Sequence, residues 1–265
     1  MALGVNIVSQ FDSKGIKQAL AEFKKLEGAG AKSTYALRTM DSALNNGVKQ
    51  IMKYGTLVAG TAGVFAYSLV NAASSVEESM SKVRVVFGNS AQAVVDFAST
   101  SASSIGMSKQ QALEAAGTYG NLFQAFGIGK KASQEMSTEL VKLAADLASF
   151  NNASIDDALQ ALRSGLSGET EPLKRFGVAL NDVRLKQEAL NLGIYSGKGN
   201  LDIAAKSQAA FALIMKDTAL AQGDFERTSS GVANQQRILA AQFADVRAEL
   251  GEALIPTFKL SLIHI

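Results

Sequence analysis

Apolar residues recur every three to four positions through most of the chain, which is the spacing of one face of an α-helix. Over residues 130–150 they form a single stripe, made of Met136, Leu140, Leu143, Leu147 and Phe150. Capping residues stand where new stripes begin: Ser108 precedes Gln111 by three positions, and Ser154 precedes a stripe that begins at Ile155. The pattern therefore predicts a mostly α protein, a helical bundle core with long amphipathic helices.

Local signals predict further helix boundaries. Ser74 and Ser75 are each followed three residues later by a glutamate, the form of a capping box, so a helix is expected to begin there. The last long helix carries an apolar stripe made of Val232, Leu239, Phe243, Val246, Leu250 and Leu254. Such a stripe suits a long helix with a partner, as in a coiled coil. Pro256 is expected to end this helix, because proline has no backbone N–H.

Residues 1–53 form a basic arm, with eight Lys or Arg against four Asp or Glu. Alternation of apolar and polar positions over residues 3–11 predicts a short N-terminal strand, and a polar helix follows to about Lys53. The basic side chains of the arm are Lys14, Lys17, Lys24, Lys25, Lys32, Arg38, Lys49 and Lys53. They are spread out and have no interleaved aromatic residues to stack on bases, so we expect a solvated face and no specific nucleic-acid partner.

Residues 54–76 contain no charged side chain, and as a helix these 23 residues would span about 34 Å, just over the hydrocarbon thickness of a bilayer. Glycine, serine, threonine and asparagine dilute the hydrophobicity of the segment. Two interpretations stay open: a buried or self-associating helix, with close packing at Ala59 and Gly63, or a transmembrane helix able to enter a bilayer.

Composition excludes several kinds of chemistry. The 265 residues include no cysteine, one histidine and two prolines, so disulfides, thiolate metal sites, cysteine nucleophiles and multi-histidine metal sites are ruled out. The formal net charge of +2 is too balanced for a dedicated nucleic-acid binder. The single histidine, His264, has no acidic neighbour with which to hold a metal.

Candidate sites for catalysis or phosphate binding are weak. The stretches 28–34 and 127–130 resemble phosphate-binding loops, but the glycines do not have the spacing that a phosphate cradle needs. Asp156 and Asp157 are expected to complement the dipole at a helix N-terminus, and Glu169 and Glu171 to be loop charges. We therefore predict no catalytic, cofactor-binding or metal-binding residues, no cofactor, and a protein that is not an enzyme.

Several stretches resemble the core region of the tail tape measure proteins of tailed bacteriophages and prophages. The two most specific are LAADLASF, residues 143–150, and LRSGLSGETEPL, residues 162–173. The other matching stretches are Glu77–Val83, Val86–Ser90, Gly106–Ser108, Phe126–Ile128, Phe176–Val178, Ser230–Arg237 and Leu250–Pro256. The resemblance implies a helical core region over residues 77–180 and a helical continuation over residues 181–265. Since members of this family usually continue for hundreds of residues past the core, we expect an N-terminal fragment.

The resemblance also implies a function. A tape measure protein is a virion structural protein that sets the length of the tail tube during assembly and is expelled on genome ejection. The implied partners are the tail tube protein, tail assembly chaperones, tail tip or baseplate proteins and further copies of the chain. The implied locations are the lumen of the virion tail, the host cytoplasm during assembly and, on infection, the host inner membrane. Two alternatives remain: a membrane-active ejection or pore-forming protein that acts through residues 54–76, and a muralytic enzyme region.

Overall fold

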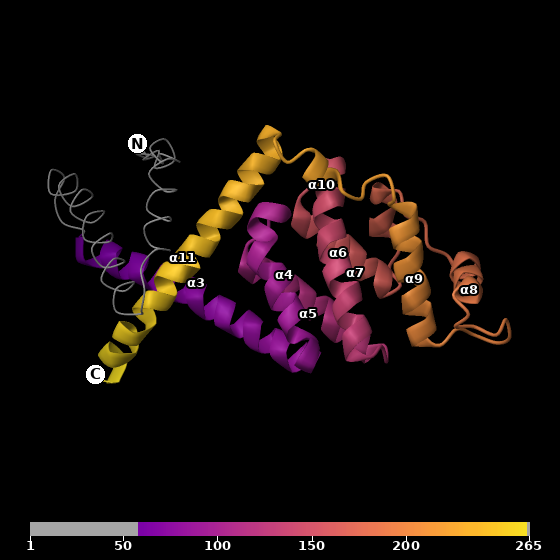
Figure 1. The fold of residues 1–265 in the computed structure, drawn as a ribbon, viewed down its shortest axis with the longest axis horizontal. Coiled ribbons are helices and arrows are strands. Elements are labelled where there is room, and N and C mark those ends of the chain that lie inside the picture. The colour runs from indigo at the N-terminus through magenta and orange to yellow at the C-terminus, as the bar shows by residue number, and fades with distance from the viewer. Residues whose placement is uncertain (1–57, 264–265) are drawn as a thin grey trace, which may run out of the picture. The chain divides into compact units, whose positions relative to one another are not determined.

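The computed structural model describes residues 58–263 (Figure 1), and the prediction of a mostly α protein is confirmed. Over this range every regular element is an α-helix or a short 3-10 helix (η). The elements are α3 (Val58–Phe87), η2 (Gly88–Ser90), α4 (Ala91–Ser104), α5 (Lys109–Ala125), α6 (Lys130–Phe150), α7 (Ile155–Leu166), η3 (Glu171–Phe176), α8 (Asp182–Asn191), α9 (Ile203–Asp217), α10 (Asp224–Arg227) and α11 (Val232–Ile263). The predicted strand at residues 3–11, the basic arm and His264 lie outside the described residues.

The chain divides into two compact units, and the boundaries fall inside α3 and α11. One unit comprises Met1–Ser74 with Val246–Ile265 and the other comprises Ser75–Asp245. In the first unit, the fully buried side chain of Leu69 packs against Val70, Leu250 and Ala253. Leu250, from the predicted stripe of the last helix, therefore makes an apolar contact with α3.

The second unit has one continuous hydrophobic core, to which α4 to α10 all contribute. Consecutive helices from α4 to α7 pack on one another, and α6 packs against both α5 and α7 (Figure 1). The predicted stripe of α6 supplies Leu140, Leu143 and Leu147 to this core, all buried. Phe150 of the same stripe is 54% exposed, which contradicts the prediction, because it is the last residue of α6 and adjoins the exposed turn at Asn151.

Helices α8, α9 and α10 complete this core. Leu185, Ala209 and Phe225 are buried in it, and the ring of Phe211 on α9 meets that of Phe123 edge to face, with 6.5 Å between centroids. Arg184 on α8 donates two hydrogen bonds to the Asp217 carboxylate at the end of α9, at 2.8 and 2.7 Å. These hydrogen bonds lower the pKa of Asp217. Residues beyond 180 thus share one core with those before it.

Several predicted helix starts are confirmed. Ser108 and Gln111 form a capping box at α5, where the Gln111 N–H donates to the Ser108 hydroxyl at 3.3 Å. The Asp157 N–H donates to the Ser154 hydroxyl at 3.0 Å, so Ser154 caps α7. The capping boxes predicted at Ser74 and Ser75 are wrong, because α3 runs through both positions: no glycine or proline interrupts the chain between Val64 and Phe87.

The prediction that Pro256 ends the last helix is wrong. Helix α11 continues through Pro256 to Ile263, although a proline inside a helix removes one hydrogen bond of the ladder and its ring crowds the preceding turn. In its first half the predicted stripe faces outward: Val232, Leu239 and Phe243 are 76%, 41% and 38% exposed. Asn234 and Ala241 are the buried positions there instead.

The sequence leaves a transmembrane helix open over residues 54–76, of which the structure describes residues 58–76. Within residues 58–263, no helix combines the length and hydrophobicity that crossing a membrane requires. In α3, the polar residues Ser68, Asn71 and Ser74 dilute the apolar run, and charged residues begin at Glu77.

Candidate functional site

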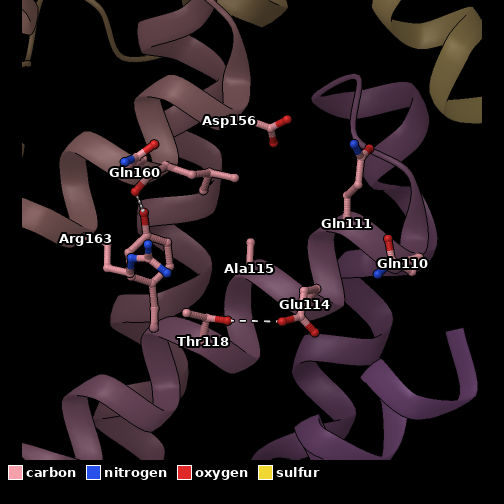
Figure 2. Close-up of a pocket in the computed structure, with 10 residues that line it drawn as sticks. Gln110, Gln111, Glu114, Ala115, Thr118, Asp156, Gln160 and Arg163 are labelled. Atoms are coloured by element: carbon pink, nitrogen blue, oxygen red, sulfur yellow. Dashed lines mark hydrogen bonds between the residues drawn. The ribbon is translucent and has the colours of Figure 1, made fainter. Parts of the chain in front are cut away.

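A cavity of about 290 Å³ lies between α5 and α7 (Figure 2). Asp156, Gln160 and Arg163 stand at positions i, i+4 and i+7 of α7 and form one wall. The opposite wall comes from α5 and consists of Gln110, Gln111, Glu114, Ala115 and Thr118. The lining is thus rich in amides and charged groups and has few apolar side chains.

Contacts within the protein already occupy several of these groups. The Lys82 ammonium lies 2.7 Å from a Glu114 carboxylate oxygen and donates to the Thr118 hydroxyl at 2.8 Å. The Tyr119 hydroxyl donates to the Leu159 carbonyl at 2.7 Å, which joins α5 to α7, and burial raises the pKa of Tyr119. Tyr119 is therefore a neutral packing residue and holds the floor of the cavity in place.

A second cavity of about 460 Å³ adjoins the first and shares Gln110, Gln111 and Asp156 with it. The N-terminal ends of α5 and α7 form one side of it, including Ser108 and Ser154. The first half of α11 forms the other side through Arg237, Ala240, Ala241 and Ala244. We call this space the α11 cavity.

Two clusters of hydrogen bonds join helices that are far apart in the sequence. Asp146 on α6 accepts hydrogen bonds from the backbone N–H groups of Gly223 and Phe225, at 2.8 and 3.0 Å, and so caps α10. Burial raises the pKa of Asp146 despite these two hydrogen bonds. Asn234 on α11 is buried and donates to the hydroxyls of Ser149 and Thr228, at 2.9 Å each. We call these the Asp146 joint and the Asn234 joint.

The candidate residues from the sequence do not come together in either cavity. Asp156 and Asp157 lie in the first turn of α7, as predicted; Asp156 lines both cavities, whereas Asp157 pairs with Arg175 at 3.2 Å. Glu169 and Glu171 are exposed, and neither lines either of these two cavities.

The loop-like stretch 127–130 has a structural role. Gly127 has a φ of +87° in the turn after α5, and Gly129 is the N-cap of α6. The stretch 28–34 lies outside the described residues. At residues 127–130 the resemblance to a phosphate loop therefore reflects a helix-to-helix turn.

Sequence reasoning missed the polar walls of the α5–α7 cavity. The signal was present, since Asp156, Gln160 and Arg163 follow helical spacing on the side of α7 away from its deepest core residues. It was not distinctive, because any solvated helix face carries polar residues at the same spacing.

Chemically, the two cavities offer hydrogen-bond donors and acceptors. In the described part of the chain, no group of three or more Asp, Glu or His side chains could hold a metal ion. No protein-family model, no curated protein and no solved structure matches this chain.

Proposed function

We propose that this chain is the core-containing part of a tail tape measure protein, a structural component that sets the length of a phage tail tube. One observation carries the proposal: polar residues of the resembling stretches form hydrogen bonds that join distant helices. Asp146 and Ser149 belong to the stretch at residues 143–150, and Asn234 and Arg237 to the stretch at residues 230–237. Asp146, Ser149 and Asn234 form the two joints, and Arg237 on α11 donates a hydrogen bond to the Asn234 side chain.

A second stretch that resembles the family also makes its contacts within the protein. In the segment 162–173, Gly165 gives room for the buried side chain of Leu173, and Leu162 and Leu166 are buried in the core. The stretches that resemble the family thus supply packing and joints between helices. Packing and joints are what a structural protein requires of its distinctive residues. Arg163 and Arg237 of the same stretches also line the two cavities.

The proposed partners are the tail tube protein, the tail assembly chaperones, tail tip or baseplate proteins, and further copies of the chain. The proposed locations are the tail lumen in the virion and the host cytoplasm during assembly. On infection the chain would leave the tail ahead of the DNA.

Protease protection of the assembled virion tests this proposal. In intact tails the chain should resist an added protease as long as the tail is closed, and should become cleavable once ejection is triggered. A tail-surface protein of the same virion is the control for protease activity. Absence of the chain from purified tails, or cleavage in closed tails, would contradict the proposal.

A further inference from the structure

We infer that the first half of α11, residues 232–245, is a detachable strap that opens locally from the helical core while the core stays folded, with residues 228–231 as the flexible hinge before it. The inference rests on contacts within residues 75–245 and does not depend on the proposed function. Three features carry it: a firm anchor before the hinge, a few polar contacts after it, and unfilled space beneath the strap.

The chain is firmly held up to the hinge. The Asp146 joint fixes the start of α10, and the Phe225 side chain is buried in the core. Phe225 also packs closely on Gly106, where an added Cβ would come within 2.8 Å of its ring. Movement of the strap would therefore leave α10 in place.

The hinge residues Thr228, Ser230 and Gly231 are exposed. Within the hinge, the Gly231 N–H donates to the Thr228 carbonyl at 2.9 Å. The Thr228 hydroxyl also donates to the Asp224 carbonyl at 2.7 Å and lies 3.0 Å from the Ser149 hydroxyl. The Gln235 side-chain amide donates to the Ser229 carbonyl at 2.7 Å. Short polar segments with a glycine accommodate large changes in backbone dihedral angles at little cost.

After the hinge, polar contacts hold the strap to the core. Asn234 makes the joint with Ser149, and Arg237 donates to the Asn234 side-chain oxygen at 2.6 Å and to the Ala153 carbonyl at 2.9 Å. At the other end of the strap, an Asp245 carboxylate oxygen accepts a hydrogen bond from the Lys109 N–H at 2.7 Å. Water can replace each of these contacts when the strap opens, so their net contribution to holding it is modest.

Apolar burial under the strap is small. Ala241 is the one apolar side chain among residues 232–245 that is buried, and Ile238 is half-buried. The α11 cavity of about 460 Å³ lies between the strap and the ends of α5 and α7. Since buried apolar area resists opening most strongly, local opening of the strap costs much less than unfolding of the core.

Hydrogen exchange of the purified chain, followed by mass spectrometry, tests this inference. Amides of residues 232–245 should exchange much faster than those of α5 and α6, at a rate that low denaturant hardly changes. Asn234→Ala should speed exchange in the strap by about tenfold and leave α6 unchanged, since it removes buried hydrogen bonds only at the joint. Gln236→Ala, at an exposed position of the same helix, is the matched control and should change neither.

The wild-type chain alone can overturn the inference, so it does not depend on whether the variant folds. Strap amides as protected as those of α6, with the same dependence on denaturant, would mean that the strap opens only with the core. If Asn234→Ala raised exchange equally across α5, α6 and α11, that result would also mean that the strap opens only with the core.

Distance measurements provide an independent readout, because the chain contains no cysteine and labels can be placed singly. Spin labels at Gln236→Cys and Glu139→Cys, both exposed sites, should give two distance populations, and Asn234→Ala should enrich the longer one. A reference pair at Glu139→Cys and Gln160→Cys should give one population. A single unchanged population for the strap pair would overturn the inference.

Discussion

Leu173 packs so closely on Gly165 that a Cβ built at position 165 would lie 2.0 Å from the Leu173 Cδ1. Gly165 is in α7, and Leu173 follows in η3, where its side chain is fully buried. The absence of a side chain at position 165 therefore lets the chain fold back on α7 after Leu166. This contact explains why the stretch at residues 162–173 has a glycine at 165 and a leucine at its end, whereas Gly168 adopts a φ of +103° in the turn between them.

The first prediction concerns this contact. Gly165→Ala should destabilise the protein by about 2 kcal/mol, because the new methyl group overlaps a buried leucine in a well-packed core. Urea unfolding followed by circular dichroism measures the change. Gly117→Ala is the matched control within a helix: its Cβ would meet only the Lys82 methylenes, at 3.3 Å, and the gain in helix propensity should make it neutral or slightly stabilising. Equal effects of the two substitutions would contradict the role assigned to Gly165.

The second prediction concerns the Asp146 joint. Asp146→Ala should lower the free energy of unfolding by about 2–3 kcal/mol, since the N–H groups of Gly223 and Phe225 lose their acceptor. Glu139→Ala on the same helix is the control, because the Glu139 side chain is exposed and makes only a surface ion pair with Lys142. If both variants unfolded at the same urea concentration, the Asp146 joint would contribute no more to the free energy of unfolding than a surface ion pair.

The third prediction concerns pH. The hydrogen bonds from Arg184 lower the pKa of Asp217 in the folded state, so their stabilisation is complete above the ordinary aspartate pKa of about 4 and is lost as the pH falls through the lowered value. Asp217→Asn should therefore cost about 1–2 kcal/mol at pH 7 and progressively less as the pH falls below about 4 and through the lowered pKa. Thermal unfolding of both proteins across this range measures the difference. A cost that does not change with pH would show that the ion pair is not its source.

The fourth prediction separates a structural role from an enzymatic one. Glu169 and Glu171 are exposed, and Glu171 pairs only with Lys174, a surface contact at 2.6 Å. The double variant Glu169→Gln, Glu171→Gln should change the free energy of unfolding by less than about 0.5 kcal/mol and should leave phage titre unchanged. Loss of titre together with normal stability and normal tail assembly would instead indicate that these carboxylates do chemistry.

Local signals predicted much of the fold. The limits of α6 and the caps at Ser108 and Ser154 follow from residues within one or two helical turns. The same logic failed at Ser74 and Ser75, because a serine three residues before a glutamate occurs inside helices as well as at their starts. Only an interruption of the helix before such a pair would make it a cap, and α3 has none there.

The joints could not be predicted in this way. Asn234 and Ser149 are 85 residues apart, and nothing in either neighbourhood specifies the other. The outward direction of the first half of α11 has the same origin. Its apolar stripe indicates a helix with a partner, whereas within the described chain the contacts of Asn234 and Arg237 turn the opposite face toward the core and leave Leu239 and Phe243 exposed. The joints and the orientation of the first half of α11 thus both depend on polar contacts between residues far apart in the sequence.

The central claim, that this chain belongs to a molecular ruler, is tested most directly by tail length. In-frame deletions and duplications would be placed in the gene that encodes the chain, outside the codons for residues 75–245, and tails would be measured by electron microscopy. A helical ruler predicts that tail length changes linearly, by roughly 1.5 Å for each residue removed or added. Viable phages whose tails keep their original length over a series of such changes would contradict the claim.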